Sequence, residues 1–350
     1  MRRPTPHFWR GRRVLVTGHT GFKGAWLTLM LSHLGARVTG LALAPPSGPC
    51  LFPLLASGVR LEHRIVDLRE AVAVKAVTRA AGPSVVLHLG AQSLVPRGFE
   101  DPAGTFAVNV TGTLNLLEAL RETPGIDAAV VVTTDKVYRN GNDGRRFQED
   151  DPLGGDDPYS ASKAAAELAV ACWRESFSAR MPPVATARAG NVIGGGDFAS
   201  SRLVPDIVRA IGGEAPLTLR YPNATRPWQH VLDVLTGYLL LAEHIASGPG
   251  MPLPSVNFAP DVEDEVPVTA LIDAFARAFD APLAWCQAGS VPPEASRLAL
   301  DPRLAMERLG WRSRFGRAQM IADTASWYAA WWRGEDMAAR CARDVAEVLT

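Results

Sequence analysis

Six short apolar runs alternate with helical patterns over the first 190 residues of the chain. The runs expected to form strands are 13–17, 37–43, 65–67, 85–89, 129–133 and 184–188. The expected helices lie at 24–34, 70–81, 102–121 and 158–179. Strands this apolar are buried on both faces, so the alternation predicts a parallel sheet with helices on each side. The predicted fold class is therefore α/β, a doubly wound parallel sheet of the Rossmann type.

Beyond residue 190 the pattern changes. Three consecutive glycines at 194–196 and several prolines break the chain into short elements. One strongly apolar helix, expected at 231–246, should pack back on the sheet, and two more helices are expected at 267–279 and 316–333. We therefore expect residues 1–190 to form a dinucleotide-binding domain. Residues 191–350 should form mainly a smaller C-terminal region that binds the substrate.

The composition argues against several classes of function. Lys+Arg and Asp+Glu each total 36, so the net charge is near zero, unlike that of a nucleic-acid-binding protein. No apolar stretch approaches the roughly 20 residues that span a bilayer, and the N-terminus lacks an apolar signal core. The four cysteines are scattered, without metal-ligand spacing. We expect a cytoplasmic protein with reduced thiols, no metal site, and neither nucleic acid nor membrane as a partner.

A glycine-rich segment follows the first expected strand and opens the first helix. It reads Thr17-Gly18-His19-Thr20-Gly21-Phe22-Lys23-Gly24. Its glycines allow a tight turn, close approach of the backbone to a pyrophosphate, and close packing of helix on strand. The segment therefore predicts dinucleotide binding, with a spacing typical of short-chain dehydrogenases/reductases. Lys23 and His19 could approach a phosphate or lie on the helix surface.

The second expected strand ends without the carboxylate that commonly binds the adenosine ribose. It ends Leu41-Ala42-Leu43-Ala44, so the choice between NAD and NADP stays open at this point. Asp67 and Leu68, at the end of the third expected strand, are placed to meet an adenine edge.

Tyr159 and Lys163 lie four residues apart at the start of an expected helix, so their side chains share one face. A tyrosine hydroxyl ordinarily titrates at about pH 10, and a nearby ammonium lowers that pKa. Tyr159 can then accept the proton of a sugar hydroxyl while hydride leaves the same carbon for a nicotinamide. Thr134, at the end of the fifth expected strand, would hydrogen-bond the same oxygen.

Asp135 and Lys136 add an acid and an amine at that strand end. Simple oxidation of an alcohol needs neither group, so the pair indicates oxidation coupled to elimination. Strand ends of a doubly wound sheet form its ligand crevice, which favours catalysis over the alternative, a local ion pair. Either residue could be the acid and the other the base.

Several segments together resemble the CDP-glucose 4,6-dehydratases, which are extended short-chain dehydrogenases/reductases. The resemblance covers almost the whole chain. Besides the glycine-rich segment it rests on residues 8–9, 134–136, 157–163, 188–197 and 226–231. The last two segments are the more specific ones, because the related dTDP-glucose dehydratases differ there. Those relatives also have Asp-Glu in place of Asp135-Lys136.

The resemblance implies a lyase that holds NAD and acts on a nucleotide sugar, CDP-glucose. Hydride would leave C-4, water would be lost across C-5 and C-6, and hydride would return to C-6. The product would be CDP-4-keto-6-deoxyglucose, a precursor of deoxysugars for polysaccharide biosynthesis. The implied catalytic residues are Thr134, Asp135, Lys136, Tyr159 and Lys163. The implied cofactor-binding residues are Gly18, His19, Thr20, Gly21, Phe22, Lys23, Gly24, Asp67, Leu68, Ala91, Tyr159 and Lys163. The implied substrate-binding residues are Gln92, Asn109, Asn191, Arg226 and His230.

Two stretches depart from the family's pattern. The family usually reads Ala-Ala-Gln-Pro-Leu-Val-Arg-x-Ser-Tyr where residues 90–99 read Gly-Ala-Gln-Ser-Leu-Val-Pro-Arg-Gly-Phe. Its Glu-Ala-His-Tyr-Leu-x-Leu-Asp segment appears as Glu-Ala-Ser-Arg-Leu-Ala-Leu-Asp at 294–301. The changed residues, 93–99 and 296–299, would face the sugar or its lid, so the exact sugar stays open here.

Two alternatives use the same fold. A nucleotide-sugar epimerase, or a related NAD-using enzyme, would keep Tyr159 and Lys163 but would not need Asp135 and Lys136. A non-catalytic nucleotide-binding sensor would need neither pair, and the intact Tyr159–Lys163 pair argues against it. We expect a homodimer built from the helices at about 102–121 and 158–179, the surface that this superfamily commonly uses.

Overall fold

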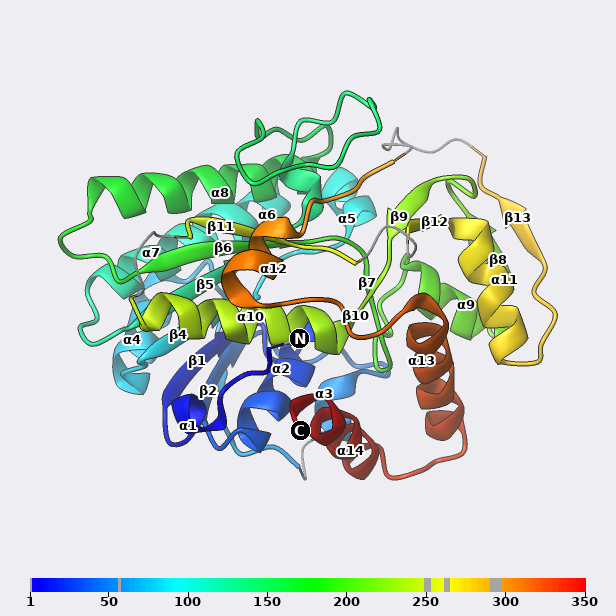
Figure 1. Ribbon diagram of the computed structural model, residues 1–350, viewed down its shortest axis with the longest axis horizontal. Coiled ribbons are helices and arrows are strands. Elements are labelled where there is room, and N and C mark those ends of the chain that lie inside the picture. Colours follow the sequence, from blue (N-terminus) through cyan, green and yellow to red (C-terminus); the bar gives the residue numbers. More distant parts are fainter. Residues whose placement is uncertain (1, 56–57, 249–252, 261–264, 290–296) are drawn as a thin grey trace.

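The computed structural model describes residues 2–55, 58–248, 253–260, 265–289 and 297–350. Its centre is a sheet of seven parallel strands in the order β11-β6-β5-β4-β1-β2-β3 (Figure 1). The strands are β1 (Arg13–Thr17), β2 (Arg37–Ala42), β3 (Leu61–Ile65), β4 (Val85–His88), β5 (Ala128–Val132), β6 (Val184–Ala189) and β11 (Ser255–Phe258). The chain runs outward from β1 to β3 and then returns to the other side of β1 as β4. The predicted doubly wound α/β fold is confirmed.

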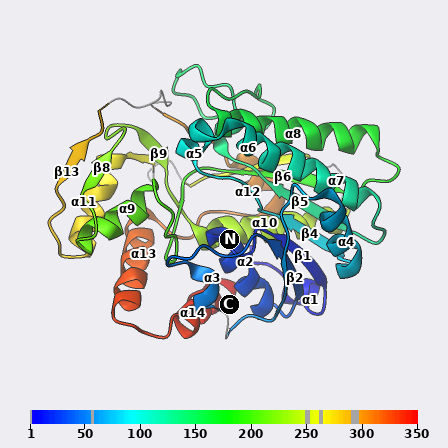
Figure 2. The same ribbon diagram turned by 180° about the vertical axis from the view of Figure 1, so that it is seen from behind.

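Two layers of helices cover the sheet, because side chains alternate between its faces along each strand. Val14 and Val16 of β1 belong to the core that the sheet shares with α2 and α10. This layer of helices lies in front of the sheet in Figure 1. Leu15 belongs to the opposite core, with α4, α7 and α8, the layer seen from its own side in Figure 2. These helices are α2 (Phe22–His33), α10 (Val231–Ala246), α4 (Ala71–Ala81), α7 (Gly112–Arg121) and α8 (Pro158–Ser176).

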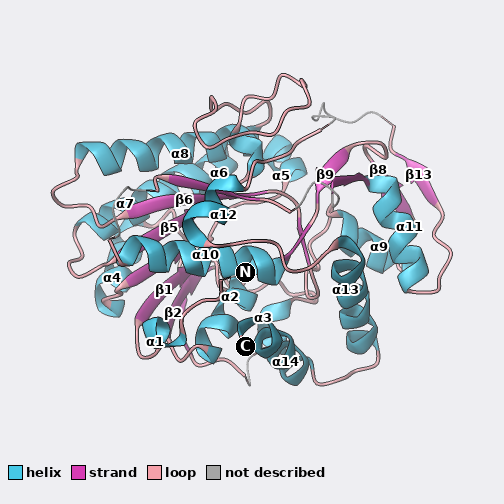
Figure 3. Ribbon diagram, viewed as in Figure 1, coloured by secondary structure: helices cyan, strands magenta, loops and turns pink. Residues whose placement is uncertain are grey.

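The remaining elements are short. Before residue 190 they are α1 (Pro6–Trp9), α3 (Leu51–Leu54), α5 (Val95–Glu100), α6 (Pro102–Phe106), the π-helical turn η1 (Ala107–Thr111) and the 3₁₀ turn η2 (Asp135–Val137). After it come β7 (Val192–Ile193), α9 (Leu203–Ile211), β8 (Leu217–Leu219), β9 (Thr225–Pro227), β10 (Gln229–His230), β12 (Glu265–Pro267), α11 (Val268–Ala278), β13 (Trp285–Gln287), α12 (Arg303–Leu309), α13 (Arg317–Trp332) and α14 (Met337–Leu349). In Figure 3 the β8–β13 and β9–β12 pairs, with α9, α11 and α13, form a group beside the large sheet.

Segments from beyond residue 190 also contribute to the large sheet and its cover. β11 is its seventh strand, paired with β6, and α10 packs against β5. The expected division of the chain at residue 190 stays a prediction. Among the described residues, none of the helices is long and apolar enough to cross a membrane.

Two expected elements differ from the structure. The third strand was expected at 65–67, but β3 covers Leu61–Ile65. That expectation is wrong because β3 lies at the sheet edge, where most of its side chains are exposed, and so it lacks the apolar run of a central strand. The helix expected at 102–121 is interrupted by η1, a π-helical turn between α6 and α7.

A buried ion pair joins α8 to the sheet. Glu167 of α8 accepts hydrogen bonds from Arg188 of β6, from Nε to Oε1 at 3.0 Å and from Nη2 to Oε2 at 2.8 Å. Thr133 and Thr186 also donate to the Glu167 carboxylate, at 2.5 and 2.7 Å. These contacts fix how α8 lies against the ends of β5 and β6.

Candidate active site

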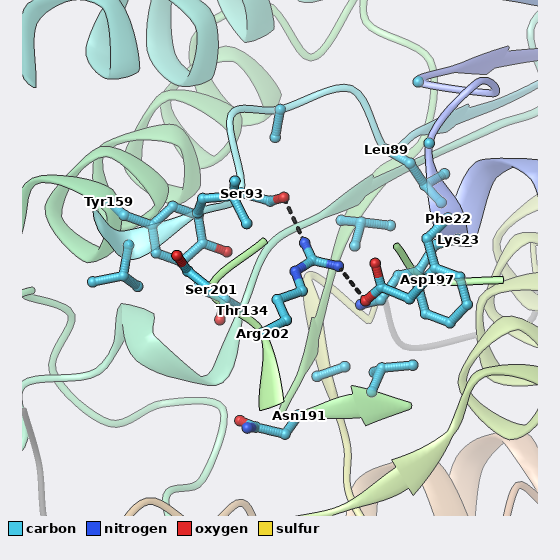
Figure 4. A pocket seen from close by; sticks show the side chains of 18 of the residues that line it. Phe22, Lys23, Leu89, Ser93, Thr134, Tyr159, Asn191, Asp197, Ser201 and Arg202 are labelled. Atoms are coloured by element: carbon cyan, nitrogen blue, oxygen red, sulfur yellow. Dashed lines mark hydrogen bonds and ion pairs between the residues drawn. The ribbon is translucent and has the colours of Figure 1, made fainter. Parts of the chain in front are cut away.

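A cavity of about 570 Å³ lies at the carboxyl ends of β1, β4, β5 and β6. This is where doubly wound sheets bind their ligands. The predicted site residues that line it are Gly18, Thr20, Gly21, Phe22, Lys23, Gly24, Asp67, Leu68, Ala91, Thr134, Asp135, Lys136, Tyr159, Lys163, Asn191 and Arg226. Figure 4 shows the arrangement of several of these side chains around the cavity. The remaining four predicted residues, His19, Gln92, Asn109 and His230, are not part of its lining.

The glycine-rich turn from β1 to α2 has the close contacts that the sequence predicts. Gly18 has a φ of +74°, and a Cβ there would lie 2.7 Å from the backbone nitrogen of Gly90. A Cβ on Gly24 would lie 2.1 Å from the carbonyl oxygen of Gly18. No described side chain caps the N-terminus of α2, so its first N–H groups can bind an anion. The turn therefore fits the pyrophosphate of a dinucleotide.

The lining of the cavity favours anions. Its basic residues are Lys23, Arg69, Lys136, Lys163, Arg202, Arg220 and Arg226, and its acidic residues are Asp67, Asp135, Asp197 and Asp206. Burial, with a further contribution from Arg202, lowers the pKa of Lys23 to about 8. The excess of basic groups suits ligands that carry several phosphates. Within the described ranges, no three His, Cys, Asp or Glu side chains gather as a metal ion would require.

Asp135 begins the η2 turn directly after β5 and is 2% exposed. Its Oδ1 accepts a hydrogen bond from Thr134 Oγ1 at 2.9 Å. Its Oδ2 is buried without a hydrogen-bond partner in the described part of the protein. A Cβ on Gly190 would lie 3.1 Å from Oδ2, so a side chain at position 190 would press against that oxygen. Burial raises the pKa of Asp135, although Lys136 and Thr134 oppose the shift, and this is the direction that a general acid requires.

Tyr159 and Lys163 lie in the first two turns of α8, which begins with Asp157 accepting a hydrogen bond from the Ser160 N–H. Lys163 Nζ donates to the carbonyl oxygen of Val132 at 2.8 Å, and burial lowers its pKa to about 8. Burial raises the pKa of Tyr159 to about 12, against a hydrogen bond to Thr134 and the charge of Arg202. The expected lowering of the Tyr159 pKa by Lys163 is therefore wrong for the protein by itself, because burial dominates.

Gln92 and Asn109 hold a loop in place and do not face the cavity. Asn109 Oδ1 accepts from the Gln92 N–H at 2.8 Å, and Asn109 Nδ2 donates to the Gln92 carbonyl and to Ser162 Oγ, both at 2.9 Å. The Gln92 side chain bonds to Leu94 and Thr105. Since protein groups occupy both side chains, their predicted direct contact with the substrate is corrected to a role in positioning residues 90–94.

Neither His19 nor His230 is among the residues that line the cavity. His19 Nε2 hydrogen-bonds to His63 Nδ1 at 2.5 Å, and a Cβ on Gly40 would lie 2.5 Å from the His19 ring. The side chain is thus packed under β2 and does not reach the cavity. His230 Nδ1 accepts from the Leu232 N–H at 3.4 Å, which caps α10. The predicted ligand contact of the His19 side chain is corrected on this geometry, and the substrate contact predicted for His230 stays a prediction.

Asp67 lines the cavity with its carboxylate already paired. It accepts hydrogen bonds from the guanidinium and the backbone N–H of Arg69, which lower its pKa. Any contact of Asp67 with an adenine edge therefore competes with Arg69.

The two stretches that depart from the family's pattern behave differently. In the first, residues 93–96 line the cavity, whereas Arg97 pairs with Glu100 at the surface. In the second, Arg297 Nη2 donates to Glu265 Oε2 at 3.0 Å, and residues 298–299 are buried. Residues 297–299 do not line the cavity, which argues against their facing the sugar directly. That they face its lid stays a prediction. Ser296 lies outside the described residues.

Three basic residues of the cavity lack a sequence signal: Arg69, Arg202 and Arg220. Arg202 Nη1 donates to Asp197 Oδ2 at 2.9 Å, and Arg202 Nη2 donates to Ser93 Oγ at 2.7 Å (Figure 4). Asp197 ends the segment 188–197, which the sequence analysis noted. Arg202 lies five residues beyond it and belongs to none of the motifs.

The sequence and the structure were compared with known proteins. Residues 14–253 match the model of the NAD-dependent epimerase/dehydratase family. A CDP-glucose 4,6-dehydratase from Salmonella typhimurium is 38% identical over 98% of this chain and 98% of its own length. A dTDP-glucose 4,6-dehydratase from Xanthomonas campestris is 28% identical over 90% of this chain and 92% of its own length. A UDP-glucose 4-epimerase from Thermus thermophilus, solved with NAD, superposes with a TM-score of 0.77 at 27% identity, over 91% of this chain and 99% of that one.

The raised pKa of Tyr159 predicts that its hydroxyl stays protonated in mildly alkaline solution. An ordinary tyrosine is half ionised at about pH 10, whereas Tyr159 should ionise only toward pH 12. Ultraviolet absorbance of the phenolate should therefore be the same, at about pH 10, in the wild type and in Tyr159→Phe without ligands. Circular dichroism would verify that both remain folded. At about pH 10, a phenolate absorbance that is lower in the variant by the amount of one half-ionised tyrosine would contradict the burial argument.

Proposed function

The chain belongs to the NAD-dependent epimerase/dehydratase family, and on that premise we propose that it removes water from CDP-glucose to give CDP-4-keto-6-deoxyglucose. The observation that carries the proposal is Asp135, a buried carboxyl with one unpaired oxygen that lines the same cavity as Thr134 and Tyr159. The 38% identity with a CDP-glucose 4,6-dehydratase over nearly the whole chain supports it. Oxidation alone requires only a base that takes the proton of the alcohol. Loss of water also requires an acid, and Asp135 can be that acid.

Tyr159 takes the proton of the C-4 hydroxyl, and Thr134 hydrogen-bonds to Tyr159. When bound at the glycine-rich turn, NAD supplies the hydride acceptor for C-4, the hydride donor for C-6, and a positive charge that favours the phenolate. Arg202 adds positive charge near the same group, and Lys163, fixed by its hydrogen bond to Val132, lines the same cavity. Buried cations near the hydroxyl partly offset the cost of ionising it.

Asp135 gives its proton to the departing C-6 hydroxyl, because hydroxide is a poor leaving group. Its raised pKa keeps a larger fraction of the carboxyl protonated than in an exposed aspartate. Lys136, the next residue, takes the C-5 proton when it is present as the neutral amine, and it returns that proton to C-5 when hydride reaches C-6. Asn191 and Arg226, which line the same cavity, bind the diphosphate, and the buried Arg226 brings a charge that a diphosphate can match.

An epimerase is the second candidate, since a solved UDP-glucose 4-epimerase shares the fold. Epimerisation would use Tyr159 and Lys163 but would give Asp135 no catalytic role. The unpaired, buried oxygen of Asp135 therefore favours dehydration. A non-catalytic sensor on this fold would not need Tyr159 and Lys163 in the cavity.

The substrate can be tested by incubating the protein and NAD with CDP-, dTDP-, GDP- and UDP-glucose and following the loss of water by mass spectrometry. CDP-glucose alone should lose water, because the segment 226–231 resembles that of CDP-glucose dehydratases. Equal turnover of dTDP-glucose would remove the basis for that choice. An unchanged mass with an inverted C-4, seen by nuclear magnetic resonance, would support the epimerase instead.

Asp135→Asn should separate oxidation from elimination. Oxidation at C-4 relies on Tyr159, Thr134 and NAD, whereas loss of a general acid typically slows a step about a hundred- to ten-thousand-fold. The variant should stall before elimination, so enzyme-bound NADH should accumulate and be visible by its absorbance. The exposed Asp150→Asn offers a matched control that should turn over like the wild type. Dehydration by Asp135→Asn at a near wild-type rate would show that Asp135 is not the acid.

We also propose a homodimer formed through α6, α7 and α8. Exposed large apolar side chains lie on two of these helices, with Leu168 of α8 61% exposed and Phe106 of α6 39% exposed. Light scattering at micromolar concentration should give twice the chain mass of 37.5 kDa. Leu168→Glu, which places a charge in the proposed interface, should shift the population toward monomer. A wild-type monomer would exclude the proposed dimer.

A further inference from the structure

The Arg202 side chain forms a bridge across the cavity between Ser93 and Asp197. Ser93 lies in the loop after β4, Asp197 follows β7, and Arg202 precedes α9. Figure 4 shows the guanidinium between Tyr159 and Thr134 on one side and Phe22 and Lys23 on the other. The bridge consists of the 2.7 Å contact to Ser93 Oγ and the 2.9 Å contact to Asp197 Oδ2.

Both ends of the bridge are anchored independently of Arg202. The loop that carries Ser93 is held by the hydrogen bonds between Gln92 and Asn109. Asp197 accepts from the Ala199 N–H at 3.1 Å, and its carbonyl accepts from the Tyr328 hydroxyl at 2.5 Å. The part that can move with little cost is therefore the Arg202 side chain, which is 33% exposed and has several rotatable bonds.

The bridge lies where ligands have to pass. An occupant that extends from the glycine-rich turn, where Phe22 and Lys23 lie, to Tyr159 meets the guanidinium on its way. Arg202 is also the group best suited to follow such an occupant, because a guanidinium binds phosphate oxygens in a bidentate manner. The guanidinium of Arg202 can form stronger, charge-assisted hydrogen bonds with a diphosphate than with the neutral hydroxyl of Ser93.

We propose that a diphosphate draws Arg202 away from Ser93, so that the Ser93–Arg202 contact lowers the affinity of the cavity for its diphosphate ligand. The closed bridge reduces the fraction of the protein that can bind, and apparent affinity falls by the same fraction. The inference rests on the proposed function for its ligands, since CDP-glucose and NAD both contain a diphosphate.

The test uses four variants: Ser93→Ala, Ser93→Thr, Arg202→Met, and the double variant Ser93→Ala/Arg202→Met. Calorimetry measures the Kd of CDP and, separately, of NAD for each folded protein. Ser93→Ala should bind at least one of the two ligands about three- to tenfold more tightly than the wild type, the range expected for loss of one competing hydrogen bond. Ser93→Thr keeps the hydroxyl and should bind like the wild type. Arg202→Met should bind that ligand more weakly.

The double variant separates the bridge from a local effect of the serine. Without the guanidinium, Ser93→Ala should produce no further change in Kd. Unchanged affinity of Ser93→Ala for both ligands would overturn the proposal, and so would an equal gain in the Arg202→Met background. Failure of the wild type to bind CDP would contradict the proposed function alone, because the NAD titration still tests the bridge. Failure to bind either ligand would contradict both.

Discussion

The buried pair of Glu167 and Arg188 is the interaction on which the geometry of the site depends. Arg188 belongs to β6, Glu167 to α8, and Thr133 ties the same carboxylate to the end of β5. Tyr159 and Lys163 precede Glu167 on the same helix, and Thr134 and Asp135 follow Thr133 on the same strand end. One carboxylate thus sets the distance between the two halves of the catalytic group. Removing one partner from such a pair typically costs about 3–5 kcal/mol, because the other charge stays buried.

Burial then determines the protonation of the groups that this pair positions. It raises the pKa of Asp135 and of Tyr159 and lowers the pKa of Lys163 and of Lys23. Each group is therefore pushed toward its neutral form, in a cavity whose charged residues are nevertheless mostly basic. An anionic ligand reverses part of that effect on the lysines, since nearby negative charge favours the ammonium. The protonation states needed for proton transfer depend on the ligands as well as on the fold.

The sequence predicts those features that follow from apolar runs and from backbone constraints. The central strands β1, β4, β5 and β6 were placed well because they are buried on both faces. β3 was misplaced because an exposed edge strand has no such run. β11, only four residues long and far along the chain, was not recognised as a strand of the large sheet.

For side chains the limit is direction. His19 and Asn109 occupy positions next to the cavity, but sequence spacing cannot show that one packs under β2 and the other bonds to Gln92. The position of the Arg202 side chain depends on its contacts to Ser93 and Asp197, and no local sequence pattern predicts that position. The pKa of Tyr159 depends in the same way on how much of the surrounding protein excludes water, which a Tyr-x-x-x-Lys spacing does not reveal.

The exposed edge strand β3 has a consequence for how copies of this protein can meet. Its side chains include Glu62, His63 and Arg64, and charges along an open edge discourage another strand from pairing with it. At the opposite edge, the backbone N–H of Asn257 in β11 donates to Glu149 Oε1 at 2.8 Å, and the Asn257 side chain bonds to Phe147. Continuation of the sheet from one molecule into the next is thus obstructed on both sides. The polar residues of β3, which made this strand hard to recognise in the sequence, thus also disfavour edge-to-edge aggregation.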